Sequence, residues 1–245
     1  TDFIVGNLGL NSRLTASDSR PATMYVKDFN GNGFVEQVIA CYNGDVSYPL
    51  PLRDDLIKSL SYLKSRYPSY ETYARASITE MFPPADLEGA LIKSAHTFAT
   101  TLVRNNGDGS FTMVPLPPEA QLAPVYGILA ADVDGDGSTD LLLAGNFDGF
   151  KPEIGRMSAS YGLLLRGNGK GDFTPVRQAA SGFFVPGESR DIQRLRTRAG
   201  PLYIVARNND VPLAFRPAAA ARPVVARRSP AARPGSTRPT APSGL

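Results

Sequence analysis

The sequence predicts an all-β protein: a partial β-propeller of about three blades plus a fragment, with a helical insertion and a disordered C-terminal tail. Three observations lead to this prediction: a repeated hairpin motif, a repeated acidic loop, and strand-like apolar runs beside each of them. Repeated β units that each end in a hairpin are typical of propeller blades. We expect blades over residues 1–216 and the tail over 217–245.

The hairpin motif occurs twice, at an offset of 62 residues. The segments RNNGDGSFTMV (104–114) and RGNGKGDFTPV (166–176) align without gaps, and an apolar run precedes each. Asn, Asp and Gly tolerate the positive φ of tight β-turns. Each motif therefore predicts two antiparallel strands joined by a short turn.

The acidic loop also occurs twice, in KDFNGNGFVEQVIA (27–40) and ADVDGDGSTDLLLA (131–144). The N-terminal TDFIVGN resembles TDLLLAGN (139–146) with one residue fewer, so we interpret it as a third copy that starts at the last position of its loop. Further blades are then expected upstream of Thr1. The predicted unit is strand, acidic loop, strand, variable excursion and hairpin, so that the hairpin at 104–114 completes the unit that begins with loop 28–36.

The last unit has lost its acidic loop. Asp191-Ile192 and residues 202–206 keep strand-like character, and Asn208-Asn209-Asp210 provide a turn. We expect strands there without a metal loop.

A helical insertion interrupts the β pattern at about 52–98. Its apolar residues follow helical spacing in LRDDLIKSLSYLKSRY (52–67), where Pro68 ends the helix and Ser69 can cap the next one, YETYARASITEMF (70–82). A third helix is predicted over DLEGALIKSAHTFA (86–99).

The acidic loops place oxygen donors at alternate positions, which is the pattern that a tight turn needs to surround Ca²⁺. Side chains at positions 1, 3, 5 and 9 and the backbone carbonyl at position 7 would coordinate the ion. The ligands are Asp132, Asp134, Asp136, Ser138 and Asp140 in one loop, and Asp28, Asn30, Asn32, Phe34 and Glu36 in the other. Loop 132–140 offers four carboxylates and loop 28–36 offers two, so we expect loop 132–140 to bind Ca²⁺ more tightly. The alternative is a pair of Asp/Asn/Gly turns that bind nothing.

Other metal sites fit the sequence less well. An EF-hand needs Glu at position 12 of its loop, where this chain has Ile39 and Leu143. Mg²⁺ prefers stricter octahedral geometry, and Zn²⁺ prefers His or Cys, of which the chain has only His96 and Cys41.

Composition limits the remaining classes. The chain is 42% hydrophobic and 20% charged, which is ordinary for a globular protein, and it has no apolar run long enough to span a membrane. Its net charge of +3 comes from six arginines in residues 216–245, without which 20 basic residues face 23 acidic ones. That segment lacks interleaved aromatics, so nucleic-acid binding is not expected.

The residues quoted above resemble the FG-GAP/VCBS repeat and, more widely, the C-terminal part of the cartilage acidic protein family, whose members often carry an ASPIC/UnbV domain. The stretches TDFIVGNLGLN (1–11), PLRDDLIKSL (51–60), PLPPEAQLAPVYGI (115–128) and SGFFVPGESRDI (181–192) carry the wider resemblance. It implies a secreted, periplasmic or cell-surface propeller that binds calcium. Asn30 and Asn32 depart from the usual aspartates, and no ASPIC/UnbV module follows the blades.

Together these observations predict a non-catalytic scaffold for adhesion or for binding an extracellular protein or glycan. The alternative is a polysaccharide hydrolase or lyase that uses a carboxylate pair drawn from Glu153, Glu188 and Asp191.

Overall fold

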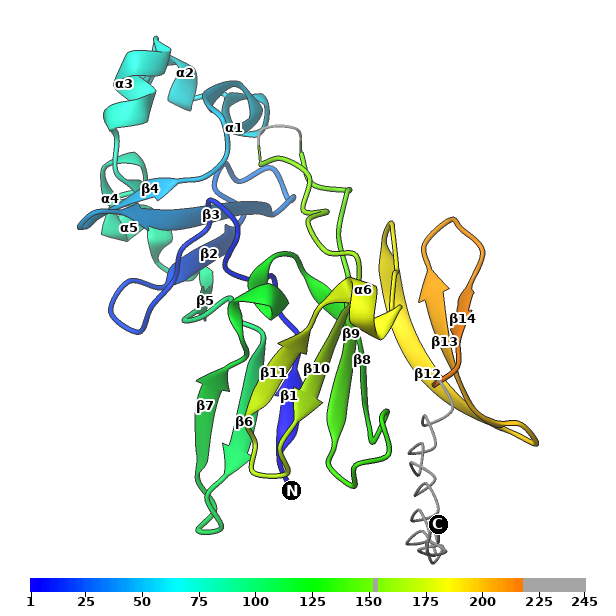
Figure 1. Cartoon of the computed structure of the whole chain (residues 1–245). Helices are drawn as coiled ribbons and strands as arrows, with labels where there is room; N and C mark the ends of the chain where they lie inside the picture. Colours follow the sequence, from blue (N-terminus) through cyan, green and yellow to red (C-terminus); the bar gives the residue numbers. More distant parts are fainter. Residues whose placement is uncertain (152–153, 218–245) are drawn as a thin grey trace, which may run out of the picture.

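The structure is a computed structural model that describes residues 1–151 and 154–217 (Figure 1). The chain is mostly β, with four small antiparallel sheets and a few short helices. The strands are β1 (Phe3–Val5), β2 (Ala22–Lys27), β3 (Glu36–Asn43), β4 (Val46–Pro49), β5 (Leu91–Ala95), β6 (Thr101–Asn105), β7 (Phe111–Pro115), β8 (Val125–Ala131), β9 (Asp140–Gly145), β10 (Leu163–Gly167), β11 (Phe173–Val176), β12 (Ser189–Thr197), β13 (Gly200–Arg207) and β14 (Leu213–Phe215). The predicted tail, beyond Pro217, lies outside the described residues.

Three sheets pack face to face, with the sheet β11-β10-β9-β8 in the middle (Figure 1). Every residue of β9 is buried, because its two faces meet two different sheets. Leu141 and Leu143 pack with Leu102 of the sheet β1-β6-β7, whereas Leu142 packs with Ile192 of the sheet β12-β13-β14. A continuous run of leucines therefore forms a central strand between two cores.

The N-terminal copy of the repeat is confirmed by its register. β1 pairs with β6 through Phe3 and Val103, and β9 pairs with β10 through Leu141 and Leu165. Val103 and Leu165 are 62 residues apart, the offset of the hairpin motif, and Phe3 and Leu141 occupy the same position in TDF and TDL. The prediction for the hairpin at 104–114 was wrong. This hairpin joins β1, so it does not complete the unit that begins with loop 28–36. The two paired strands, β1 and β6, are nearly a hundred residues apart in the sequence, so local sequence patterns could not predict that they pair.

The fourth sheet, β4-β3-β2-β5, lies with the helices in the segment between β1 and β6 and forms a separate lobe (Figure 1). The helices are α1 (Arg53–Ser59), α2 (Leu63–Arg66), α3 (Tyr70–Arg75), α4 (Ile78–Met81) and α5 (Pro84–Leu87). Ser69 caps α3 as expected, accepting a hydrogen bond from the Thr72 amide. Most of the apolar residues that predicted the first helix form the core of the lobe with β3, namely Leu56, Leu60, Leu63 and Tyr67. Leu52, which belongs to the same pattern, is exposed.

The predicted helices differ from the structure in length, and the third one was wrong. Each of the first two is split in two, and the third is limited to α5. Residues 91–95 form β5, which pairs with β2 from Leu91 opposite Val26 to Ala95 opposite Ala22. Gly89, with φ 75°, takes the chain out of the helical region just before this strand. The helices therefore cover 53–87, and the rest of the proposed insertion is strand and loop.

The last sheet contains the predicted strands and turn. β12 and β13 pair along their length, and residues 208–210 lead into β14. A further short helix, α6 (Gln178–Ser181), lies at the end of the stack away from the turns of the β6–β7 and β10–β11 hairpins (Figure 1). A 3₁₀ helix, η1 (Pro118–Gln121), precedes β8. None of the helices in residues 1–151 and 154–217 has the length and apolar character needed to cross a bilayer.

Candidate metal site

The acidic loop 132–139 joins β8 to β9 at the end of the middle sheet. It lies between two antiparallel strands, as predicted, which is a context unlike the helix pair of an EF-hand. Gly135 and Gly137 have φ 83° and 88°, and these positive angles turn the chain back sharply enough to bring alternate side chains together.

Backbone amides of the loop hold its carboxylates in place. Asp132 accepts hydrogen bonds from the amides of Gly135 (2.7 Å, at Oδ1) and Gly137 (3.1 Å, at Oδ2). Asp134 accepts one from the Asp136 amide at 3.2 Å, and Asp136 one from the Ser138 amide at 2.7 Å. The loop thus orients three negative charges before any ligand binds, although carboxylates this close would otherwise repel each other.

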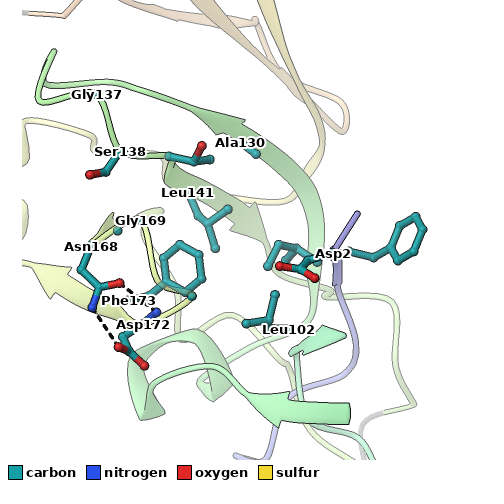
Figure 2. Close-up of a pocket in the computed structure, with 15 residues that line it drawn as sticks. Asp2, Leu102, Ala130, Gly137, Ser138, Leu141, Asn168, Gly169, Asp172 and Phe173 are labelled. Carbon is teal, nitrogen blue, oxygen red and sulfur yellow. Dashed lines mark hydrogen bonds between the residues drawn. The ribbon is translucent and has the colours of Figure 1, made fainter. Parts of the chain in front are cut away.

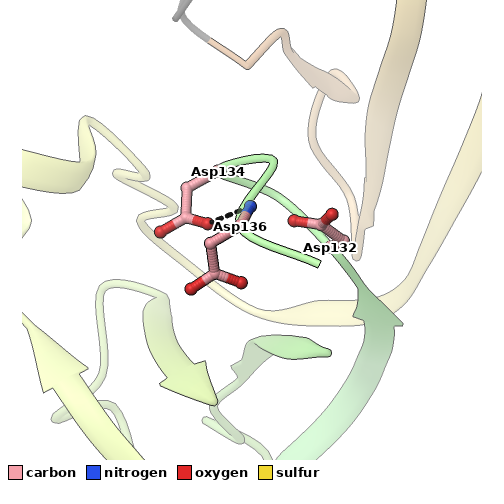
Figure 3. A group of neighbouring side chains, drawn as sticks. All are labelled: Asp132, Asp134 and Asp136. Atoms are coloured by element: carbon pink, nitrogen blue, oxygen red, sulfur yellow. Dashed lines mark hydrogen bonds between the residues drawn. The ribbon is translucent and has the colours of Figure 1, made fainter. Parts of the chain in front are cut away.

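Asp132, Asp134 and Asp136 are exposed and converge, each with an oxygen within 4.8 Å of the others (Figure 3). Two oxygens that bind one Ca²⁺ at about 2.3–2.6 Å are at most about 5 Å apart. The spacing and the hard oxygen donors therefore fit a calcium ion. They could hold a metal ion through three of the five predicted ligands.

Asp140, the fourth predicted carboxylate, is not part of this cluster in the structure. Its side chain is buried; Oδ2 accepts the Val133 amide at 3.0 Å, and Oδ1 accepts the Gly167 amide of β10 at 3.0 Å. It therefore closes the loop and fixes it to the neighbouring strand. Ser138, whose backbone carbonyl was predicted to coordinate, lies at the rim of a cavity of about 460 Å³.

This cavity separates the loop from the sheet β1-β6-β7 (Figure 2). Asp2, Asn168 and Asp172 line it, and the Asn168 amide group donates to Asp172 at 2.8 Å. A water occupies about 30 Å³ in the liquid, so the space beside Gly137 and Ser138 accommodates several. The three carboxylates do not line this cavity but are exposed to solvent, from which waters would complete the six to eight oxygens of a calcium ion.

Arg166 is a site residue that was not predicted. Its Nε lies 2.7 Å from Asp134 Oδ2, so a guanidinium already neutralises part of the cluster. Arg166 belongs to the repeated RGNGKG motif, which was visible in the sequence, but its proximity to the loop depends on the pairing of β9 with β10.

The loop at 28–36 repeats this hydrogen-bond pattern. Asp28 accepts the amides of Gly33 (2.7 Å) and Asn32 (3.1 Å); the first bond matches that from Gly137 to Asp132, and the second comes from one position later than the Gly135 bond of the other loop. The Gly33 hydrogen bond, more than any other contact, lowers the pKa of Asp28 below its usual range. Glu36 accepts the Phe29 amide at 3.0 Å, as Asp140 accepts that of Val133.

The donor set of this second loop is poorer. Asn30 Oδ1 accepts the Asn32 amide at 3.1 Å, as Asp134 accepts the Asp136 amide, but a neutral amide takes the place of the carboxylate. The Asn30 amide nitrogen donates to Glu36 Oε1 at 3.2 Å and to the Ser59 carbonyl at 3.0 Å. The Asn32 oxygen accepts the Phe34 amide, and the Phe34 side chain is 76% exposed. Within the described ranges, the only cluster of three converging metal-ligating side chains is the one formed by Asp132, Asp134 and Asp136.

The carboxylates considered for an enzyme are engaged elsewhere or not described. Glu153 lies outside the described residues. Glu188 accepts hydrogen bonds from the Asp148 amide, Asn208 and Arg190, which lower its pKa, the Asp148 amide having the largest effect. A carboxyl held ionised in this way is unsuited to donate a proton as a general acid. Asp191 bonds to the Ile192 amide and Gln193.

Comparisons with protein-family models, curated proteins and solved structures gave no match to this chain.

Proposed function

We propose that the protein is a calcium-binding, non-catalytic scaffold of the β-propeller type, in which a metal ion at loop 132–140 stiffens the stacked sheets. The observation that carries this proposal is the convergence of Asp132, Asp134 and Asp136 within 4.8 Å on a loop whose amides orient them. Loop 28–36 is proposed as a second, weaker site because it offers two carboxylates and two amides.

The same geometry supports an extracellular setting. The three carboxylates are exposed, and waters must supply much of the coordination. Sites of this kind in extracellular modules have dissociation constants of about 10⁻⁴–10⁻³ M, weaker than those of intracellular calcium sensors. We propose a secreted, periplasmic or cell-surface protein whose sheets present a surface to a protein or glycan ligand.

Thermal unfolding with and without metal tests this proposal. EDTA should lower the melting temperature and added Ca²⁺ should restore it, since a site held at 100 times its dissociation constant stabilises the fold by about 2.7 kcal/mol. Asp136→Asn should remove most of this calcium effect. Asp108→Asn is the matched control, because Asp108 is an exposed carboxylate in another Gly-containing turn, that of the β6–β7 hairpin.

The proposal predicts a metal response in the wild type and in the control but not in Asp136→Asn. An identical melting curve in EDTA and in millimolar Ca²⁺, with no heat of calcium binding, would refute it.

A further inference from the structure

The sheet β1-β6-β7 exposes apolar side chains on its outer face. Phe3, Phe111 and Met113 are 52%, 49% and 60% exposed, and the Phe3 and Phe111 rings lie 6.0 Å apart. The register places Phe3, Val103 and Met113 in one row across the three strands. Val5, two residues from Phe3, is on the same face of β1.

In the middle sheet the equivalent positions are covered. Phe3 and Val103 correspond to Leu141 and Leu165, which are almost completely buried against β6 and its neighbours. The opposite faces of the two sheets are also equivalent. Ile4 of β1 packs on the middle sheet, and its counterpart Leu142 of β9 packs on the sheet β12-β13-β14. The exposed row of β1-β6-β7 is therefore the face that a preceding sheet covers elsewhere in this molecule.

Hydrogen bonds at the end of β1 support the same equivalence. Asp2 Oδ1 accepts the Asn105 amide at 2.9 Å, and Asp140 Oδ1 accepts the Gly167 amide at 3.0 Å. Asn105 and Gly167 are again 62 residues apart. Asp2 thus occupies the position that, in the middle sheet, ends an acidic loop and begins a strand.

The sheet β1-β6-β7 has one strand fewer than the middle sheet. β9 pairs with β10 on one side and with β8 on the other, whereas β1 pairs with β6 and is the edge strand of its sheet. An edge strand presents unpaired N–H and C=O groups, which accept an added strand readily. We infer that the free edge of β1 takes an antiparallel strand of the β8 type, apolar and followed by an acidic loop, from a further copy of this repeat.

An additional repeat fits the edge of β1 better than a second molecule of this chain does. The β8 strand of a second molecule is already paired with β9 and partly buried, so that it would have to be released first. The inference does not rest on calcium binding at loop 132–140, because the pairing of β1 uses backbone groups and apolar side chains.

A synthetic peptide of residues 125–138, which spans β8 and most of its loop, tests the inference with the full chain. The peptide should bind saturably, and amide hydrogen exchange at residues 3–5 should slow by about tenfold or more at saturation. The control is the same peptide with Ile128→Pro and Ala130→Pro, because proline removes the amides that a ladder needs. It should give no protection.

Three results would overturn the inference: no binding, protection at another sheet edge instead of β1, or β1 amides already protected in a self-associated chain. Sedimentation velocity identifies the third case. The measurements are made in EDTA and repeated in Ca²⁺. If the peptide adds as a strand in EDTA, the inference holds even when loop 132–140 binds no calcium. The experiment therefore distinguishes a failure of strand addition from a failure of calcium binding.

Discussion

Arg166 is the single residue that competes most directly with a cation at the acidic loop, since its guanidinium contacts Asp134 at 2.7 Å. Arg166→Gln should therefore bind Ca²⁺ more tightly. An exposed ion pair contributes about 0–1 kcal/mol, which limits the gain to about fivefold in the dissociation constant. Titration calorimetry measures it, and Arg104→Gln, the equivalent change in β6, is the control. Weaker binding would show that Arg166 positions Asp134 instead.

Glu188 makes a specific contribution to acid stability. Hydrogen bonds from the Asp148 amide, then Asn208 and Arg190, lower its pKa in the folded state. A lowered carboxyl pKa stabilises the fold above the unfolded value, about 4.3, and this stabilisation is lost as the pH falls through the folded pKa. Glu188→Gln should therefore show a shallower loss of stability below about pH 4.5.

Denaturant unfolding at a series of pH values measures this effect. Glu71→Gln provides the control, because Glu71 is an exposed residue that forms an ion pair with Arg75 on helix α3. A stability curve for Glu188→Gln that falls as steeply as that of the wild type below pH 4.5 would contradict the prediction.

At the scale of secondary-structure elements, β1 and β9 occupy equivalent positions in the repeat but differ in how deeply their side chains are buried. Leu143 of β9 is 2% exposed, and its repeat equivalent Val5 in β1 is 47% exposed. Leu143→Ala should lower the free energy of unfolding by about 2–5 kcal/mol, since it opens a cavity in the core. Val5→Ala should cost well under 1 kcal/mol. Equal losses would mean that β1 is covered in solution.

The elements that the sequence predicted well are those with local signatures. The turns at 106–110 and 168–172 and the acidic loops depend on Gly, Asn and Asp at fixed spacing, and the structure has strands on both sides of each. The converging carboxylates follow from the same short spacing. Ser69, a helix-capping residue, was predictable for the same reason.

The elements that were mispredicted depend on distant partners. Residues 91–95 have helical spacing with their neighbours, yet they form β5 because β2 offers an open edge at Ala22–Val26. β1 has three residues, and nothing within them specifies pairing with β6. The hydrogen bond that Asp140 accepts from the Gly167 amide was likewise not predictable from its position in the loop, because only the β9–β10 pairing brings the two together.

At the scale of the whole molecule, the described residues contain two regions with separate cores. The helices pack with β3 around Phe82, which is fully buried and lies 4.7 Å from the Phe29 ring. The three stacked sheets have their own cores on the two sides of β9. An ion pair between Lys151 and Asp55, 2.8 Å long and partly exposed, connects the regions, and such pairs contribute little.

Separate cores predict separate local stabilities. Phe82→Ala removes a large side chain from the helical lobe and should cost about 3–5 kcal/mol there. Amide hydrogen exchange should rise in β2, β3 and the helices and stay at the wild-type level in β9 and β10, because regions with few shared buried contacts open independently. Phe183→Ala, in the core shared with β13, is the reciprocal control and should raise exchange in the stacked sheets. Equal increases across both regions in either variant would show that the lobes unfold as one unit, and that contacts such as Lys151–Asp55 couple them more strongly than their exposure indicates.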